Sequence, residues 1–153
     1  MKKLILIALA FSLSAGTVVK AQEKQSQKEI FQPIYLNSKA LVASENYQFV
    51  AHVIYNDQGR ERLNADENSI VFKGSEVSGK LHSFAKDKSI VTIKASNSTT
   101  TNSFDDDNQK ISVAIKTDRY ELAIEVKPNG NAVLTITNKE GTVLHYAGKL
   151  VKP

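Results

Sequence analysis

The chain has 153 residues, and its 20 lysines and arginines against 16 aspartates and glutamates give a formal net charge of +4. Acidic and basic residues alternate along the predicted strands and form no basic cluster, so nucleic-acid binding is not expected. The chain has no cysteine, which excludes a disulfide framework and a lipid anchor on an acylated N-terminal cysteine.

The first 21 residues have the three parts of a secretory signal peptide. Lys2 and Lys3 supply a basic start, Leu4–Leu13 is apolar, and Val19–Ala21 is a small-x-small cleavage site. The apolar run is shorter than the roughly 20 residues that a membrane span needs. We therefore expect a periplasmic or secreted protein whose mature form has no membrane span.

Cleavage after Ala21 also changes the charge of the protein. It removes three of the 20 bases and none of the 16 acids, so 17 bases remain and the net charge falls to +1. Mass analysis of the protein recovered from its host should show an N-terminus at Gln22. A mature protein that still begins at Met1 would contradict the predicted localisation.

The segment after the cleavage site is predicted to contain little regular structure. Residues 22–29 are polar and aperiodic, which is typical of a flexible leader. Four apolar residues then gather around Pro33, namely Ile30, Phe31, Ile34 and Tyr35. Asn37 or Ser38 can cap a short helix through Ser44, which is the only helix that we expect.

From Tyr47 onward the apolar period becomes two, which is the period of a β-strand. The residues that share one face of this strand are Tyr47, Phe49, Ala51, Val53 and Tyr55. The sequence NDQG at 56–59 predicts a turn in which Gly59 takes a positive φ. The pattern therefore indicates an amphipathic strand followed by a tight turn.

The middle of the chain predicts three more short strands and a long loop. The runs 68–74 and 77–82 flank Gly74-Ser75, which suits a hairpin turn, and 89–95 is a further apolar run. Residues 96–109 are rich in Ser, Thr, Asn and Asp, which favours a solvated loop. The length of this loop indicates a contact surface.

The last third has the clearest strand pattern. Four runs alternate apolar and polar residues, and they are joined by three short connections. The second connection, Pro128-Asn129-Gly130, predicts a type I turn closed by a left-handed glycine. Strands connected in this way form an antiparallel meander. About eight strands and one helix predict a single all-β domain over residues 30–153. It is an antiparallel β-sandwich or a partly open β-barrel, ending in a four-strand meander.

Several short blocks of the sequence resemble those of a known family. They are FVA at 49–51, NSIVFKG at 68–74, VSGKLHSF at 77–84, YELAIEVKPNG at 120–130 and HYAGKL at 145–150. Together they are similar to an uncharacterised domain-of-unknown-function family of exported proteins from Gram-negative bacteria. The resemblance covers about Leu41 to Val151 and implies export and a β-rich fold. It implies no functional residue.

An acidic stretch, DDDNQ at 105–109, raises the question of a metal site. Asp105, Asp107 and Gln109 have the alternate spacing with which a calcium loop begins. Such a loop needs glycine at its sixth position and glutamate at its twelfth, and those positions hold Lys110 and Lys116. We therefore expect a solvated acidic loop and no metal.

The three histidines are not expected to form a site. His52, His82 and His145 lie in separate predicted strands, and no pair has the short spacing of a zinc site. Two of them, His52 and His145, alternate with apolar neighbours. Partly buried or sheet-face histidines are therefore the favoured interpretation.

No catalytic constellation stands out either. Ser75 and Ser78 occur beside glycines but not in a nucleophile elbow, and their positions suit a hairpin and a strand. Glu121 and Glu125 could imitate a glycosidase pair, but alternation places both on the polar outer face. We therefore expect a protein that is not an enzyme and binds no cofactor.

Two functional hypotheses remain. The first is a binding or interaction module of the cell envelope that acts through the 96–109 loop or a sheet edge on an envelope protein or a small ligand. The second is a carrier of a small apolar ligand inside a barrel. A packed core favours the module, whereas a cavity of roughly 300 Å3 or more lined by the Tyr and Phe positions favours the carrier.

Overall fold

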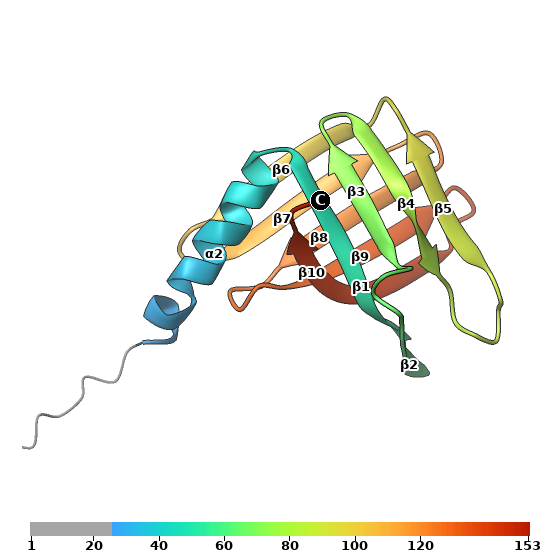
Figure 1. The fold of residues 1–153 in the computed structure, drawn as a ribbon, viewed down its shortest axis with the longest axis horizontal. Helices are drawn as coiled ribbons and strands as arrows, with labels where there is room; N and C mark the ends of the chain where they lie inside the picture. The colour runs from blue at the N-terminus through green and yellow to red at the C-terminus, as the bar shows by residue number, and fades with distance from the viewer. Residues whose placement is uncertain (1–25) are drawn as a thin grey trace, which may run out of the picture.

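The structure is a computed structural model that describes residues 26–153. Its described part contains one helix and ten strands (Figure 1). The elements, in chain order, are α2 (Gln27–Ala43), β1 (Asn46–Asn56), β2 (Gly59–Arg62), β3 (Ser69–Lys73), β4 (Glu76–His82), β5 (Ile90–Ala95), β6 (Thr99–Asp105), β7 (Lys110–Lys116), β8 (Tyr120–Val126), β9 (Asn131–Asn138) and β10 (Val143–Val151).

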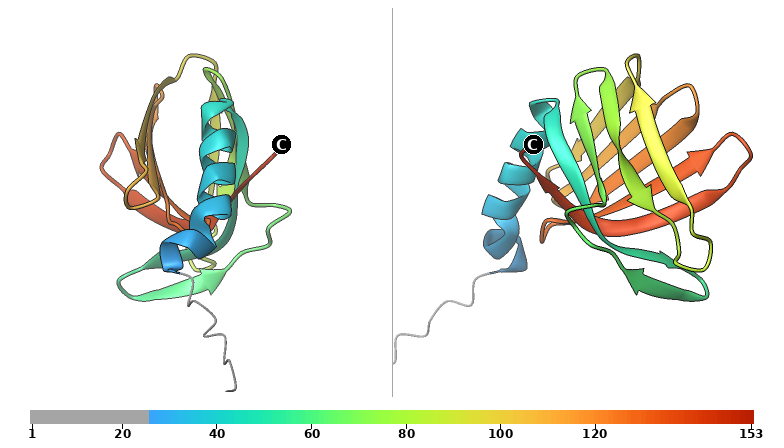
Figure 2. Two further views of the ribbon diagram at one scale, coloured as in Figure 1. Left: turned by 90° about the vertical axis from the view of Figure 1, so that its left-hand side faces the viewer. Right: turned by 45° about the vertical axis from the view of Figure 1, so that its right-hand side comes forward.

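All ten strands belong to one antiparallel sheet. Nine of them follow the order β5-β4-β3-β1-β10-β9-β8-β7-β6, and β2 pairs with the far end of β1. Figure 2 shows this sheet curling strongly, with α2 lying across one end. The all-β prediction is confirmed, and of its two alternatives the structure has the partly open barrel. The predicted C-terminal meander is also confirmed, and β6 extends it to five strands.

The helix is longer than the sequence pattern predicted. It begins at Gln27 after the cap Ser26, whose side chain forms a capping box with Glu29. Part of the predicted flexible leader is therefore helical. Asn37 and Ser38, the predicted caps, and Pro33 all lie inside the helix. Proline removes one backbone hydrogen bond from a helix, and burial of Tyr35 and Val42 compensates for that loss here.

Two predictions about β1 were wrong in detail. The register with β10 shifts between Ala51 and Val53, so β1 contains a bulge. Inward positions therefore pass from Ala51 to Ile54, and Tyr55 faces outward instead of inward. Gly59 does not have a positive φ, because the Asn56 side chain holds the turn by accepting hydrogen bonds from the Gln58 and Gly59 amides.

The predicted 96–109 loop was also wrong, because half of it is strand β6. The residues Thr99–Asp105 pair with β7 along their whole length. Threonine has a high strand propensity, since its branched side chain fits a pleated sheet. Only the turns on either side, at 96–98 and 106–109, remain outside regular structure. The predicted hairpin at Gly74-Ser75 and the left-handed Gly130 are confirmed.

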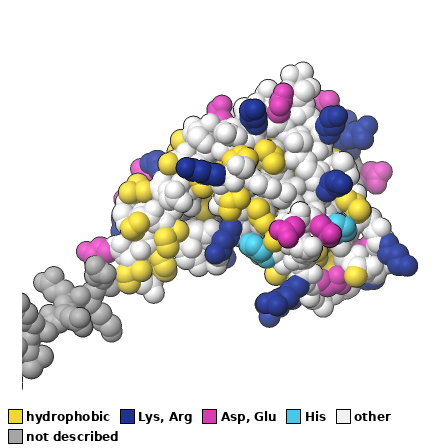
Figure 3. Space-filling model, in the orientation of Figure 1, with side chains coloured by type: hydrophobic (Ala, Val, Ile, Leu, Met, Phe, Trp, Pro, Cys, Tyr) yellow, Lys and Arg dark blue, Asp and Glu magenta, His cyan; other side chains and the backbone are white. Residues whose placement is uncertain are grey.

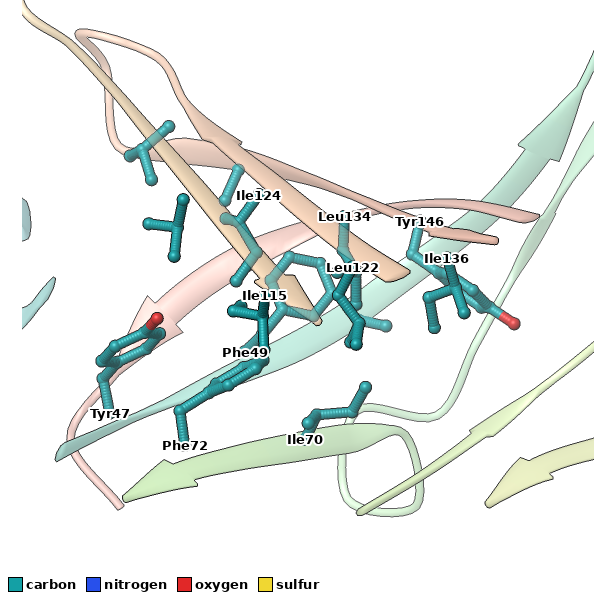
Figure 4. Packing of buried hydrophobic residues seen from close by; sticks show 14 of the residues in the cluster. Tyr47, Phe49, Ile70, Phe72, Ile115, Leu122, Ile124, Leu134, Ile136 and Tyr146 are labelled. Carbon is teal, nitrogen blue, oxygen red and sulfur yellow. The ribbon is translucent and has the colours of Figure 1, made fainter. Parts of the chain in front are cut away.

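The core fills the space inside the curled sheet. Side chains from both halves of the sheet meet there, as Figure 4 shows for Phe49, Ile70, Leu134 and Ile136, each at most 2% exposed. Tyr47 and Phe72 stack with their ring centroids 4.9 Å apart. The inward aromatic residues therefore pack against one another and against aliphatic side chains.

The predicted signal peptide and its cleavage site lie outside the described residues. So does the first part of the leader, up to residue 25. In the described part of the chain, no helix is long and apolar enough to cross a membrane.

Candidate functional site

The acidic stretch 105–109 connects the sheet to the helix. Asp106 accepts hydrogen bonds from the Tyr35 hydroxyl at 2.5 Å and from Lys39 Nζ at 2.6 Å. Gln109 is 3% exposed, and its Nε2 donates to the Lys28 carbonyl at 2.9 Å. Asp105 accepts from Asn108 and so closes the turn. The stretch is therefore a docking point for α2. The predicted solvated loop was wrong for Gln109, which is buried, whereas Asp106 remains exposed while it bonds the helix.

These contacts shift the ionisation of both partners. Hydrogen bonds from Lys39 and then Tyr35 hold the pKa of Asp106 below its usual range. Burial, followed by the hydrogen bond to the Asp106 carboxylate, raises the pKa of Tyr35 to about 12. Lys39 also lies over the Phe104 ring, 5.3 Å from its centroid. One cation, one acid and two aromatic rings thus join α2 to β6 and its turn.

Asp106→Ala is expected to lower the melting temperature at pH 7, whereas the matched change Asp107→Ala is expected to leave it unchanged. The reason is that Asp106 stabilises only the folded state as a carboxylate. Because its folded pKa is depressed, this contribution is present above the unfolded pKa of about 3.9 and is lost as the pH falls through the folded value. Thermal melts should therefore show the Asp106→Ala difference shrinking in acid. Equal melting of both variants and the parent at pH 7 would contradict this assignment.

The three histidines lie apart from one another, each in a different environment. His82 Nδ1 lies 3.0 Å from the side-chain oxygen of Asn68, which is buried. His145 lies 3.1 Å from the Thr135 hydroxyl and stacks on Tyr55. His52 is exposed at the bulge of β1. No group of three or more potential metal ligands occurs within residues 26–153.

The predicted outer-face position of the two glutamates is confirmed. Glu121 and Glu125 are exposed on β8, opposite the buried Leu122 and Ile124. Glu121 pairs with Lys116 at 3.4 Å, across neighbouring strands. This is a solvated cross-strand pair, which contributes little to stability.

Three large apolar side chains of the helix are exposed. Ile30 and Leu36 are each 51% exposed and Ile34 is 40% exposed. In Figure 3 hydrophobic side chains gather over this part of the molecule. At about 100° per residue, Ile30 and Ile34 lie side by side next to the buried Leu41, whereas Leu36 lies on the far side of the helix. Ile30 and Ile34 are called the α2 face below.

A cleft of about 320 Å3 adjoins the α2 face. Its walls are the first turns of the helix and the two turns β6–β7 and β8–β9. Phe31 and Pro128 are its apolar residues, and Lys28, Lys127 and Asp107 are its charged ones. The complete lining is Gln27, Lys28, Phe31, Asp107, Asn108, Gln109, Lys127, Pro128 and Asn129. These residues are called the α2 cleft.

Sequence reasoning missed this site because its three segments lie far apart in the chain. The sequence pattern indicates calcium-loop spacing for Gln109 and a turn for Pro128-Asn129-Gly130, but nothing in it predicts that either lies against the helix. Exposed Ile34 was assigned to a small apolar cluster. Ile34 Cγ2 lies 2.8 Å from the position that a Cβ atom on residue 130 would take. Glycine at this position therefore leaves room for the helix. The positive φ of Gly130, predicted from the turn, was the available indication.

A second cleft, of about 390 Å3, lies at the seam of the barrel between β5 and the β7–β8 connection. It is lined by Thr92–Ala95 and Thr117–Tyr120. Its charged residues Lys94, Asp118 and Arg119 are all exposed. The seam cleft is therefore a polar gap where the sheet fails to close, and it lies apart from the exposed apolar residues of the helix.

The fold and these surface features define a class of protein: an open antiparallel β-barrel with a packed interior and an N-terminal helix docked across one end. The chain belongs to the family described as "Domain of unknown function (DUF4251)", which it matches over residues 32–150. The resemblance to a domain-of-unknown-function family is thereby confirmed. No curated protein matches the chain.

A solved structure agrees with the fold. The crystal structure of a DUF4251 family protein from Bacteroides eggerthii superposes with a TM-score of 0.66 at 13% sequence identity. The match covers 77% of this chain and 87% of that chain. At this level of identity the likeness shows the fold.

Proposed function

We propose that the protein is an exported, non-catalytic binding module of the cell envelope that recognises a partner protein through the α2 face and the α2 cleft. The predicted signal peptide supports export. The separation of the histidines and the solvated Glu121–Lys116 pair support a role without catalysis.

The observation that carries the proposal is the exposure of the α2 face. Six large hydrophobic side chains of residues 26–153 are exposed, and two of them, Ile30 and Ile34, lie one helical turn apart beside the α2 cleft. Scattered apolar side chains on a surface need no explanation, but a cluster beside a cleft is typical of an interaction site. Lys28 and Lys127 line the α2 cleft and can contact polar groups of the partner. A central apolar contact surrounded by polar ones is the usual arrangement of protein interfaces.

The packed interior favours this module over the carrier of an apolar ligand. A carrier needs a cavity inside the barrel, lined by its inward aromatic residues. Phe49, Phe72 and Tyr146 are instead at most 3% exposed and form part of one contiguous core. The α2 cleft and the seam cleft have the volume for a small ligand, but both lie at the surface. Neither is lined by Phe49, Phe72 or Tyr146.

The test is photocrosslinking from single positions in the native host. A benzophenone amino acid replaces Ile30 on the α2 face and, as a matched control, Ile90 on β5, since both side chains are 51% exposed. The expected result is one discrete protein adduct from position 30 and none from position 90. The adduct should disappear when Ile34→Ser is added.

Two results would overturn the proposal. One is the absence of any adduct from position 30. The other is the same set of adducts from both positions, which would mean random encounter. Circular dichroism of the Ile34→Ser variant checks that the fold is intact, because Ile34, although 40% exposed, lies close to Gly130 of the β8–β9 turn.

A further inference from the structure

A separate hollow on the outer face of the sheet lies where β9, β10 and the bulge of β1 meet. Its volume is about 270 Å3. The small residues Ala147 and Gly148 belong to its lining together with three basic side chains, His52, Lys127 and Lys149. The complete lining is His52, Val53, Lys127, Asn131, Ala132, Val133, Ala147, Gly148 and Lys149. These residues are called the basic hollow.

The bulge of β1 is what adds His52 to the basic hollow. In a regular strand only one residue separates two inward positions, but here two residues, His52 and Val53, lie between the buried Ala51 and Ile54. A bulge of this kind re-aims a side chain relative to the regular pleat. His52 is exposed as a result and lines the hollow.

The positive charges of the basic hollow have no partner within the described part of the chain. The two ion pairs found there join Lys39 to Asp106 and Lys116 to Glu121, so neither Lys127 nor Lys149 is paired. His82 and His145 each have a side-chain hydrogen-bond partner, whereas residues 26–153 provide none for the His52 ring.

The lining of the basic hollow contains no acid. It therefore concentrates basic groups locally in a protein whose mature net charge is expected to be only +1. Glu125 precedes Lys127 by two residues and shares the outer face of β8. Its carboxylate lies more than 4.0 Å from every cation of the described residues, since it forms no ion pair, and it lines a neighbouring depression.

We propose that the basic hollow binds a small anionic group, a phosphate or a carboxylate. Lys127 and Lys149 supply charge, and the side chains of His52 and Asn131 supply N–H donors. Asn131 and Lys149 are direct neighbours across the β9–β10 ladder, so these two groups can contact one anion together. Lys127 also lines the α2 cleft, but His52, Asn131 and Lys149 do not, so binding at these three residues is tested separately from the proposed function.

The experiment is a titration of the full mature chain, followed by NMR of its backbone amides. Inorganic phosphate and acetate are the two anionic probes, and glycerol is the neutral control. The expected result is saturable shifts at His52, Asn131 and Lys149 with one of the anions and none with glycerol. Whichever anion binds more tightly identifies the class of ligand.

Three variants test the expected direction of the change in anion affinity. Lys149→Gln should weaken binding about fivefold, as the loss of one nearby charge at the surface implies. Glu125→Gln should strengthen it, because it removes the nearest negative charge on that face. Lys80→Gln, an exposed lysine on β4, should leave it unchanged.

The proposal fails if neither anion shifts the amides of the basic hollow at millimolar concentration. It also fails if the shifts spread evenly over all lysines, or if Lys80→Gln weakens binding as much as Lys149→Gln does. All of these variants are at exposed positions, so they keep the fold on which the comparison depends.

Discussion

Truncation of the chain after Gly141 is expected to give an unfolded or aggregated product. The truncation removes β10, which is the strand that joins the two halves of the sheet, β5-β4-β3-β1 and β9-β8-β7-β6. It also removes Tyr146, which is fully buried, and the partly buried Leu144 and Leu150. Their burial contributes roughly 5–10 kcal/mol. That is comparable with the whole net stability of a typical domain, about 5–15 kcal/mol.

Size-exclusion chromatography and a thermal melt check this expectation. The truncated chain would expose the edges of both β1 and β9, and unpaired edges promote association with other chains. A soluble monomer that melts cooperatively near the temperature of the parent would contradict the central position of β10.

Gly148→Ala is expected to destabilise the protein by about 3 kcal/mol, at the upper end of what overpacking costs. Gly148 lies on β10 directly opposite Ala51. A Cβ atom placed on Gly148 would lie 2.0 Å from the Val50 carbonyl oxygen and 3.1 Å from Ala51 Cα. Both neighbours are backbone atoms of β1, so no side chain can rotate away and the ladder beside the bulge must open.

The matched control is Gly59→Ala in the β1–β2 turn. No heavy atom lies within 4 Å of a Cβ placed there, and the φ of Gly59 is not positive. Denaturant titration should therefore show the midpoint of Gly148→Ala falling well below that of Gly59→Ala and of the parent. Two variants of equal stability would mean that β1 and β10 can separate locally without cost.

The C-terminal meander was predictable because each of its strands shows the alternation of apolar and polar residues by itself. Ile111, Val113 and Ile115 alternate perfectly onto the core face, and the turn glycines Gly130 and Gly141 take the positive φ that their turns need. Local pattern and tertiary structure agree there. The bulge at His52 breaks the same alternation in β1. No local sequence pattern indicates that a strand contains an extra residue.

The helix and β6 were not predictable from local pattern, because their stability comes from contacts made far along the chain. Pro33 argues against a long helix, yet Tyr35 of that helix bonds Asp106 of the turn after β6. The run Thr99–Ser103 contains no large apolar residue and resembles a loop in composition. Pairing with the strongly apolar β7 makes it a strand. The site on α2 was missed for the same reason.

The pairing of β1 with β10 also governs the order in which the molecule can fold. Gln48 of β1 pairs with Val151 of β10, so β1 can pair with β10 only after β10 has been synthesised. Contacts between residues so distant in sequence must close a long loop, and folds rich in them form in milliseconds to seconds. A chain that emerges N-terminus first can form the β3–β4 hairpin early, but it cannot complete its sheet. The two halves of the sheet therefore close around the core only after β10 has been synthesised.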